Sequence, residues 1–234
     1  MGIMTIGGVM KKKINVLGLD LDNYSVRESI SMIDAYLNDK IMHVVGIVFM
    51  DLLILAGEDV KVKESIENLD MKIIGDKEIL AVAGITRGFR VRETVENEFV
   101  IRFLEKLSHK KCTIFILCNT EEECQLFEKY LVQKFPSCIV AASYDIEKCK
   151  NDYDVVVNEI NIIEPDVVFA ALDSPARESF ILEQKSKINA RLWFELGRNI
   201  RTILTTKKVS VWFKDFINRG IFHRVVSKYK NEEK

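Results

Sequence analysis

The chain has 234 residues, 48% of them hydrophobic and 29% charged, which is enough for one large domain with a proper core. Its formal net charge of −1 conceals an asymmetry, because residues 198–234 carry ten Lys/Arg against three Asp/Glu and residues 1–197 carry 24 against 32. The longest apolar stretch, 44–57, is interrupted by Asp51 and is shorter than the roughly 20 residues that a membrane-spanning helix needs, which excludes such a helix.

The basic C-terminal part allows two interpretations. It favours an anionic partner such as a phosphate, a nucleic acid or an anionic membrane surface, or it is a solvated basic helix docked on the acidic body. No targeting segment is visible, because Lys11, Lys12 and Lys13 follow the apolar N-terminal stretch instead of preceding it.

The cysteines and histidines predict neither disulfides nor a metal site. The five cysteines form no CxxC pair and no zinc-ligand spacing, and we expect reduced, mostly buried thiols in a cytosolic protein: Cys112, Cys118, Cys124, Cys138 and Cys149. The three histidines are scattered along the chain, so no metal cluster and no bound cofactor are expected.

The first half of the chain alternates between strand and helix patterns. Strands are predicted at 14–19, 43–49 and 71–74, and helices at 25–37, 50–56, 59–69, 78–83 and 92–107. In the last of these helices Val95, Phe99, Phe103 and Leu107 should form one buried face. Residues 84–88, between the last two helices, are expected to form a loop.

The second half is more regular. Strands are predicted at 112–117, 137–142, 166–172 and 191–196, and helices at 121–134, 152–163 and 175–185. Asn119 and Thr120 are expected to cap the first of these helices. Strand–helix alternation with short connections indicates βαβ crossovers and a parallel sheet.

The stretch 165–182, PDVVFAALDSPARESFIL, is the centre of this pattern. Val167 to Ala171 is an apolar run typical of a strand buried on both faces. Asp173 and Ser174 are predicted to cap the following helix, with Pro175 in its first turn. Since open α/β sheets bind anions and nucleotides where a strand meets a helix N-terminus, we expect this junction to line any ligand site.

The C-terminal stretch 209–222, VSVWFKDFINRGIF, reads as an amphipathic helix with many aromatic residues among basic ones. Core packing is one explanation of such a stripe, and a helix lying at a membrane interface is the other.

Several local strings resemble the WecG/TagA/CpsF family of bacterial glycosyltransferases (glycosyltransferase family 26). FAALDSPARESFI at 169–181 is similar to the family pattern F-x-G-L-G-S-P-x-Q-E-x-W-I, with Leu172, Ser174, Pro175, Glu178 and Ile181 in agreement and Phe180 in place of Trp. The layout of 14–35, 45–56, 112–119 and 152–166 also fits, so the resemblance covers roughly 14–225.

The resemblance implies a fold and a function. It implies a Rossmann-like, mostly parallel sheet flanked by helices in residues 1–197, followed by a basic helical appendage in residues 198–234 that meets the membrane. Family members transfer an N-acetylmannosamine-type or related sugar from a UDP-sugar to a lipid-linked acceptor, usually an undecaprenyl-diphosphate sugar, for teichoic acid, common-antigen or capsule synthesis. Arginines of the appendage bind the diphosphate in the family, and the residues of that type are Arg198, Arg201, Arg219 and Arg224.

The chain departs from the family pattern at positions that would face the ligand. The T-x-N-P string is replaced by Ile47, Phe49 and Met50, and the Asp-Gly pair with the proposed base is reversed to Gly75-Asp76. The Gly-Gly pair after the 112–117 strand is Cys118-Asn119.

In the main motif the string G-L-G is Ala171-Leu172-Asp173, and Arg177 replaces Gln. A carboxylate at Asp173 opposes a diphosphate at a helix N-terminus, and Arg177 partly offsets that charge. The later G-G-S-F-D string has lost its acid, at about 196–200.

Three functions remain open from these residues. The first is a glycosyltransferase-fold protein with a degenerate site that binds a protein partner or a second copy of itself, or that regulates a surface-polysaccharide pathway. The second is an active transferase with Asp76 as base and with Asn119, Asp173, Ser174, Arg177 and Glu178, together with the tail arginines, at the substrate. The third is a binding module for another nucleotide or anion. In each case we expect a cytoplasmic protein with no nucleic-acid partner, placed at the inner face of the cell membrane if the appendage contacts lipid.

Overall fold

The computed structural model describes residues 12–149 and 152–197, and the predicted appendage with its four arginines and the 209–222 helix lies outside these residues. Within them the strands form one eight-stranded sheet in the order β1-β2-β4-β3-β8-β7-β5-β6. The strands are β1 Lys13–Val16, β2 Leu19–Asp22, β3 His43–Val48, β4 Met71–Ile74, β5 Thr113–Cys118, β6 Ile139–Asp145, β7 Val167–Ala171 and β8 Leu192–Glu195. All neighbouring pairs are parallel except β1 and β2, which confirms the predicted mostly parallel α/β fold.

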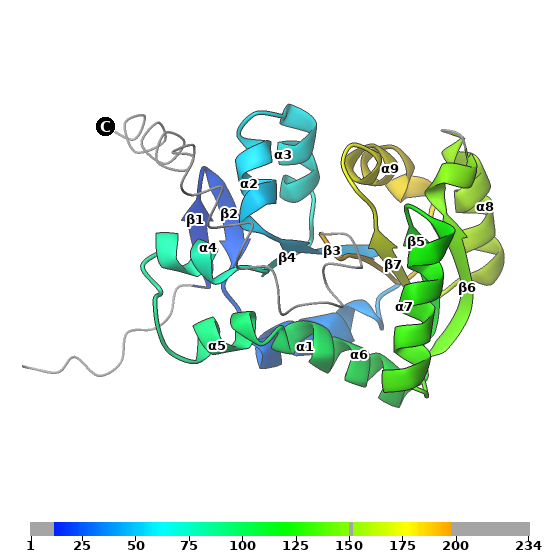
Figure 1. The fold of residues 1–234 in the computed structure, drawn as a ribbon, viewed down its shortest axis with the longest axis horizontal. Coiled ribbons are helices and arrows are strands. Elements are labelled where there is room, and N and C mark those ends of the chain that lie inside the picture. The colour runs from blue at the N-terminus through cyan, green and yellow to red at the C-terminus, as the bar shows by residue number, and fades with distance from the viewer. Residues whose placement is uncertain (1–11, 150–151, 198–234) are drawn as a thin grey trace, which may run out of the picture.

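The helices cover both faces of the sheet (Figure 1). They are α1 Val26–Tyr36, α2 Met50–Ala56, α3 Val60–Glu67, α4 Lys77–Val82, α5 Phe89–Val95, α6 Glu98–Lys110, α7 Glu121–Lys134, α8 Tyr153–Ile163 and α9 Ala176–Gln184, with short 3-10 turns at Ile146–Cys149 and Lys185–Lys187. Residues of α2, α3, α8 and α9 pack in one core cluster, and residues of α1, α6 and α7 pack in the other. The sheet therefore carries a hydrophobic core on each side.

The strand β7 lies near the middle of the sheet, between β5 and β8. All five of its residues are buried, as the apolar run predicted. Phe169 contacts the rings of Phe103 on α6 and Phe194 on β8, at centroid distances of 5.6 and 5.3 Å. A strand covered on both faces gains burial at every position, and for this reason it needs no alternation of polar and apolar residues.

Two predicted elements differ from the structure. The strand expected at 14–19 is a hairpin, because Leu17 and Gly18 both adopt positive φ (53° and 78°) and turn the chain back into β2. The helix expected at 92–107 is two helices, because Asn97 adopts the left-handed conformation between α5 and α6. Val95, predicted on the buried face, therefore ends α5 and is 57% exposed.

The cysteines are as expected. All five are free thiols, and four of them are buried, with Cys138 half-buried. None of the helices in residues 12–149 and 152–197 is both long enough and apolar enough to cross a bilayer.

Candidate functional site

The sheet has a topological switch point between β5 and β7. From β5 the chain leaves through α7 toward the β6 edge, and from β7 it leaves through α9 toward β8 on the other side. Helices α7 and α9 lie on opposite faces, so the carboxyl ends of the two strands diverge and leave a crevice, the usual ligand position in open α/β folds. This crevice has a volume of about 370 Å³ and is lined by Asn119, Ile146, Glu147, Tyr153, Asp173, Ser174 and Ala176. The structure thus brings together three of the predicted site residues.

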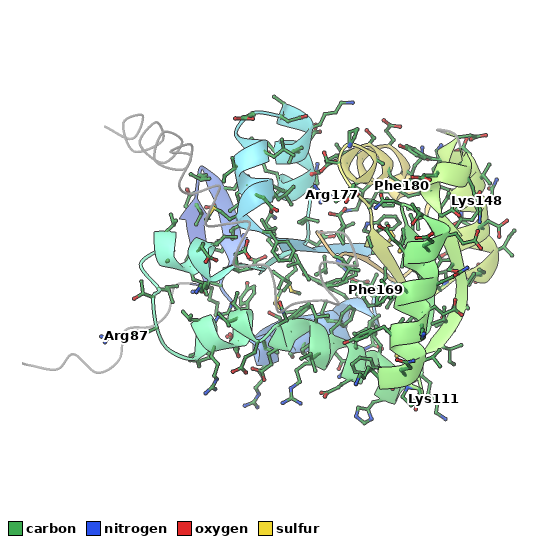
Figure 2. All side chains as sticks on the ribbon, in the orientation of Figure 1. Arg87, Lys111, Lys148, Phe169, Arg177 and Phe180 are labelled. Carbon is green, nitrogen blue, oxygen red and sulfur yellow. The ribbon has the colours of Figure 1, made fainter. Side chains whose placement is uncertain are left out.

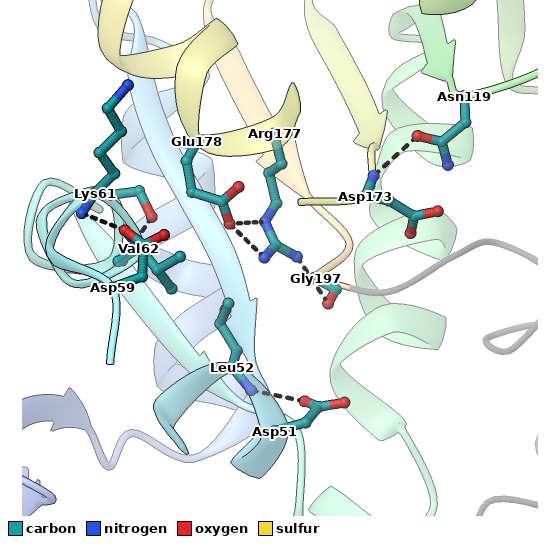
Figure 3. A network of polar contacts seen from close by, with 11 residues as sticks. Asp51, Leu52, Asp59, Lys61, Val62, Asn119, Asp173, Arg177, Glu178 and Gly197 are labelled. Atoms are coloured by element: carbon teal, nitrogen blue, oxygen red, sulfur yellow. Dashed lines mark hydrogen bonds and ion pairs between the residues drawn. The ribbon is translucent and has the colours of Figure 1, made fainter. Parts of the chain in front are cut away.

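Asn119 spans the crevice from the end of β5 to the end of β7. Its Oδ1 accepts a hydrogen bond from the backbone N–H of Asp173 (2.9 Å), and its Nδ2 donates to the carbonyl of Ala171 (3.3 Å) and to Glu123 Oε2 (3.1 Å). Figure 3 shows this amide reaching the backbone of Asp173. The side chain occupies the position where the resemblance expects a glycine, and it engages the Asp173 N–H that would otherwise face an anion.

The start of α9 differs from the prediction. The helix begins at Ala176, and its cap residue is Pro175, whose side chain forms no capping bond, in place of the predicted Asp173 or Ser174. The first turn is instead closed by backbone bonds, from the N–H of Arg177 to the carbonyl of Asp173 and from the N–H of Ser179 to the carbonyl of Pro175. Thr120 caps α7 as predicted, by accepting from the N–H of Glu123, whereas Asn119 has the bridging role described above.

Arg177 and Glu178 are buried in the protein interior, with exposures of 7% and 1%. The Arg177 Nε and Nη2 atoms donate to Glu178 Oε1 at 3.0 and 2.6 Å, and Nη1 donates to the carbonyl of Gly197 at 3.1 Å (Figure 3). The Arg177 guanidinium therefore forms its hydrogen bonds inside the protein, between α9 and the end of β8. In the described part of the chain neither residue lines the crevice.

Asp76, the candidate base, follows β4 at the carboxyl edge of the sheet and immediately precedes α4. Its Oδ2 accepts a hydrogen bond from the backbone N–H of Met50 (2.8 Å), the first residue of α2. This bond ties the carboxylate to the end of β3 and fixes its orientation. Asp76 does not line the switch-point crevice, so the structure separates the candidate base from Asn119, Asp173 and Ser174.

The reversed Gly75-Asp76 pair has a packing reason in the structure. A Cβ on Gly75 would lie 2.5 Å from the Phe49 ring and 2.8 Å from Ile47 Cγ2. Phe49 and Ile47 are the two apolar residues that stand at the polar positions of the family pattern. Glycine at 75 thus leaves room for the two bulky side chains that replace them.

Two buried carboxylates near this edge, Glu123 and Glu195, were not among the predicted site residues. Glu123 on α7 accepts from both the backbone N–H and the side chain of Asn119. Glu195 on β8 is 5% exposed, and burial raises its pKa to about 7, while the nearby Arg177 lowers the pKa and Glu178 raises it. The sequence does contain one indication of a buried Glu195, namely a charged residue inside the apolar run LWFEL. For Glu123 the sequence indicates only a place in the first turn of a helix.

The architecture defines the chain as an open α/β protein with a switch-point crevice. The model of the glycosyl transferase WecG/TagA/CpsF family matches residues 14–227, and the chain belongs to this family of glycosyltransferases. No individual curated protein matched the chain in a sequence comparison.

Proposed function

We propose that this protein is a WecG/TagA/CpsF-type glycosyltransferase-fold protein of cell-surface polysaccharide biosynthesis whose UDP-sugar site is degenerate, with weak or absent catalysis. The observation that carries the proposal is the side chain of Asn119, which crosses the switch-point crevice and binds the N–H of Asp173. A diphosphate in the crevice would have to displace this bond and the one to Ala171, each of which contributes about 1 kcal/mol.

The charge of the crevice supports the same proposal. Its described lining contains the acids Glu147 and Asp173 and contains neither Lys nor Arg. The one arginine of the main motif, Arg177, donates to Glu178 and to a backbone carbonyl in the interior. A diphosphate carries negative charge and would meet like charges at short range, which disfavours its binding.

The proposal predicts that UDP does not stabilise the wild-type protein. A thermal-shift titration with UDP and with UDP-N-acetylhexosamines, with and without a divalent cation, should show no saturable rise in Tm at millimolar ligand. The variant Asn119→Gly/Asp173→Gly, which removes the bridging amide and one carboxylate, should bind UDP more tightly than the wild type does. A ligand that binds only the folded state raises its stability, so the assay reports binding directly.

The control variant is Asn161→Gly, which removes another hydrogen-bonded asparagine side chain, on α8. It should leave the UDP response unchanged. Saturable stabilisation of the wild type by UDP would contradict the degenerate site. Stabilisation by other nucleotides or by inorganic phosphate, and not by UDP, would instead favour a binding module for another anion.

One observation favours a second function, an active hexosyltransferase that moves an N-acetylhexosamine-type sugar from a UDP-sugar to an undecaprenyl-diphosphate-linked acceptor. Asp76 stands at the carboxyl edge of the sheet with its carboxylate oriented by the N–H of Met50. An oriented carboxylate is a requirement for a general base acting on an acceptor hydroxyl.

If turnover is detected, Asp76→Asn should lower it by at least about a hundredfold and leave the UDP affinity unchanged. The asparagine oxygen would still accept from the N–H of Met50, so the local geometry should be kept. Steady-state kinetics with a lipid-linked acceptor, together with the UDP titration, separates the two effects. Turnover that survives in Asp76→Asn would exclude this residue as the base.

A further inference from the structure

Two cysteine side chains lie together where β5 passes into α7. Cys118 is the last residue of β5 and is 0% exposed, and Cys124 lies in the N-terminal part of α7 and is 2% exposed. Both belong to the hydrophobic core on the α7 side of the sheet. Both side chains therefore point into the layer between β5 and the helix that follows it.

The contacts of Cys124 place its sulfur beside the end of β5. Its Sγ donates to the carbonyl of Tyr144 on β6 at 3.2 Å. In the sheet register Tyr144 pairs with Leu117, the residue before Cys118. Since paired strands lie about 4.8 Å apart, the Cys124 sulfur is within reach of the Cys118 side chain. The Cys118 thiol donates a hydrogen bond to this sulfur.

This hydrogen bond makes the two thiols chemically unequal. It lowers the pKa of the Cys124 thiol, which burial opposes, and together with burial it raises the pKa of the Cys118 thiol. Burial also raises the pKa of Cys138, and it raises that of Cys112 to about 11. Because the thiolate is the form that reacts with an oxidant, Cys124 should be oxidised before these other cysteines.

An oxidant reaches the pair through the first turn of α7. Glu121 and Glu122 in this turn are exposed, and Lys148 joins Glu121 to Asp145 at the end of β6, at 2.9 and 2.7 Å. Lys148 is 56% exposed and lies at the outer surface in Figure 2. Exposed ion pairs contribute little to stability, so local opening of this turn uncovers the thiols at a small cost in free energy.

We propose that Cys118 and Cys124 are a modification site, at which a peroxide converts the two thiols into a reversible disulfide. The Cys124 thiolate attacks a peroxide oxygen, and the O–O bond breaks to leave a sulfenic acid on Cys124 and hydroxide. The Cys118 sulfur then attacks the Cys124 sulfur, the S–O bond breaks, and the hydroxyl group leaves as water with the Cys118 proton. The first hydroxide takes up the proton that Cys124 lost, so two thiols and one hydrogen peroxide give one disulfide and two waters.

The disulfide would enclose the asparagine that crosses the crevice. Asn119 directly follows Cys118, and Glu123, which accepts from the backbone and the side chain of Asn119, directly precedes Cys124. A covalent link at both ends of this segment fixes the amide on the N–H of Asp173. Oxidation should therefore slow hydrogen exchange of the Asp173 amide. This effect on the crevice rests on the proposed function, whereas formation of the disulfide does not.

The test oxidises the folded, full-length chain with hydrogen peroxide and alkylates the remaining thiols before mass spectrometry. The five free thiols of the wild type should fall to three. In Cys112→Ala/Cys138→Ala, the tryptic peptide 112–129 contains only Cys118 and Cys124 as cysteines. This peptide should lose two hydrogens and escape alkylation, and dithiothreitol should restore both thiols. The oxidised protein should also have a higher Tm than the reduced protein, because the disulfide restricts the unfolded chain.

Two variants separate the roles of the sulfurs. Cys118→Ala should form no disulfide, and dimedone should trap a sulfenic acid on Cys124. Cys149→Ala is the matched control, since the Cys149 thiol donates to the carbonyl of Ile146 in its own turn, and it should form the disulfide as the wild type does.

Five thiols that survive peroxide in the folded wild type would overturn the proposal. A disulfide that maps to Cys112 and Cys138 would also overturn it, as would one that forms in urea and not in the folded protein. Failure of the disulfide would leave the UDP titration unaffected, so the two proposals are tested separately.

Discussion

Replacing Arg177 with methionine should lower the free energy of unfolding by about 3–5 kcal/mol, because it leaves a buried carboxylate without its cation. Glu178 is 1% exposed, and its Oε1 receives two of the three hydrogen bonds that the Arg177 guanidinium donates. The third goes to the carbonyl of Gly197, at the end of the described chain. Urea denaturation of the wild type and the variant at one pH measures the difference.

The double variant Arg177→Met/Glu178→Gln distinguishes the effect of the ion pair from the effect of packing by the arginine side chain. Because residue 178 then has no charge, the decrease in the free energy of unfolding should be smaller than in Arg177→Met by about 2 kcal/mol or more. Arg102→Met is the surface control, since Arg102 and Glu105 are 56% and 41% exposed and an exposed ion pair contributes little to stability. Equal costs for Arg177→Met and Arg102→Met would show that the buried pair contributes no more than an exposed one.

The elements whose signals are local were predicted well. Helix α7 has the predicted bounds Glu121–Lys134, because Thr120 caps it and three acids favour its first turn. Helix α1 is bounded by Ser25, which forms a capping box with Glu28. The parallel sheet follows from strand–helix alternation, which needs no knowledge of long-range contacts.

The predicted elements are wrong where the backbone changes conformation although the spacing of apolar side chains continues. The break between α5 and α6 is at Asn97, in a sequence with neither Gly nor Pro nearby, so the apolar spacing continues across it. The β1–β2 hairpin depends on Leu17 in a positive-φ conformation that leucine rarely adopts. The spacing of the apolar residues therefore marks neither the turn at Leu17 nor the break at Asn97.

The position of the crevice was predicted, but the contacts inside it were not. The junction after β7 does line the crevice, through Asp173 and Ser174. The bridging role of Asn119 joins two strands more than fifty residues apart, and it depends on their register in the sheet. Sequence spacing contains no measure of that distance, and it likewise gave no indication that Arg177 is directed inward to Glu178.

Glu195→Gln should stabilise the protein increasingly as the pH rises from about 4.5 to above 7. Glu195 lies on β8 opposite Gly46 of β3 and Ala170 of β7 in the sheet register, and it is 5% exposed. Burial raises the pKa of Glu195 from 4.5 to about 7, with Arg177 opposing the shift and Glu178 adding to it. The folded protein therefore keeps a proton there that the unfolded chain has already released.

The sign of the effect follows from that difference in bound protons. Between pH 4.5 and 7 the folded state binds more protons than the unfolded state, so the free energy of unfolding falls as the pH rises, by about 3 kcal/mol in total. Glutamine at 195 does not titrate, so the variant should gain about this amount relative to the wild type between pH 4.5 and 8, as measured by urea denaturation at several pH values. Glu58→Gln, at an exposed position, is the control variant and is measured at the same pH values. A constant difference for Glu195→Gln would mean that the folded protein ionises Glu195 as readily as the unfolded chain does, and that the buried cluster with Arg177 and Glu178 keeps both carboxylates charged.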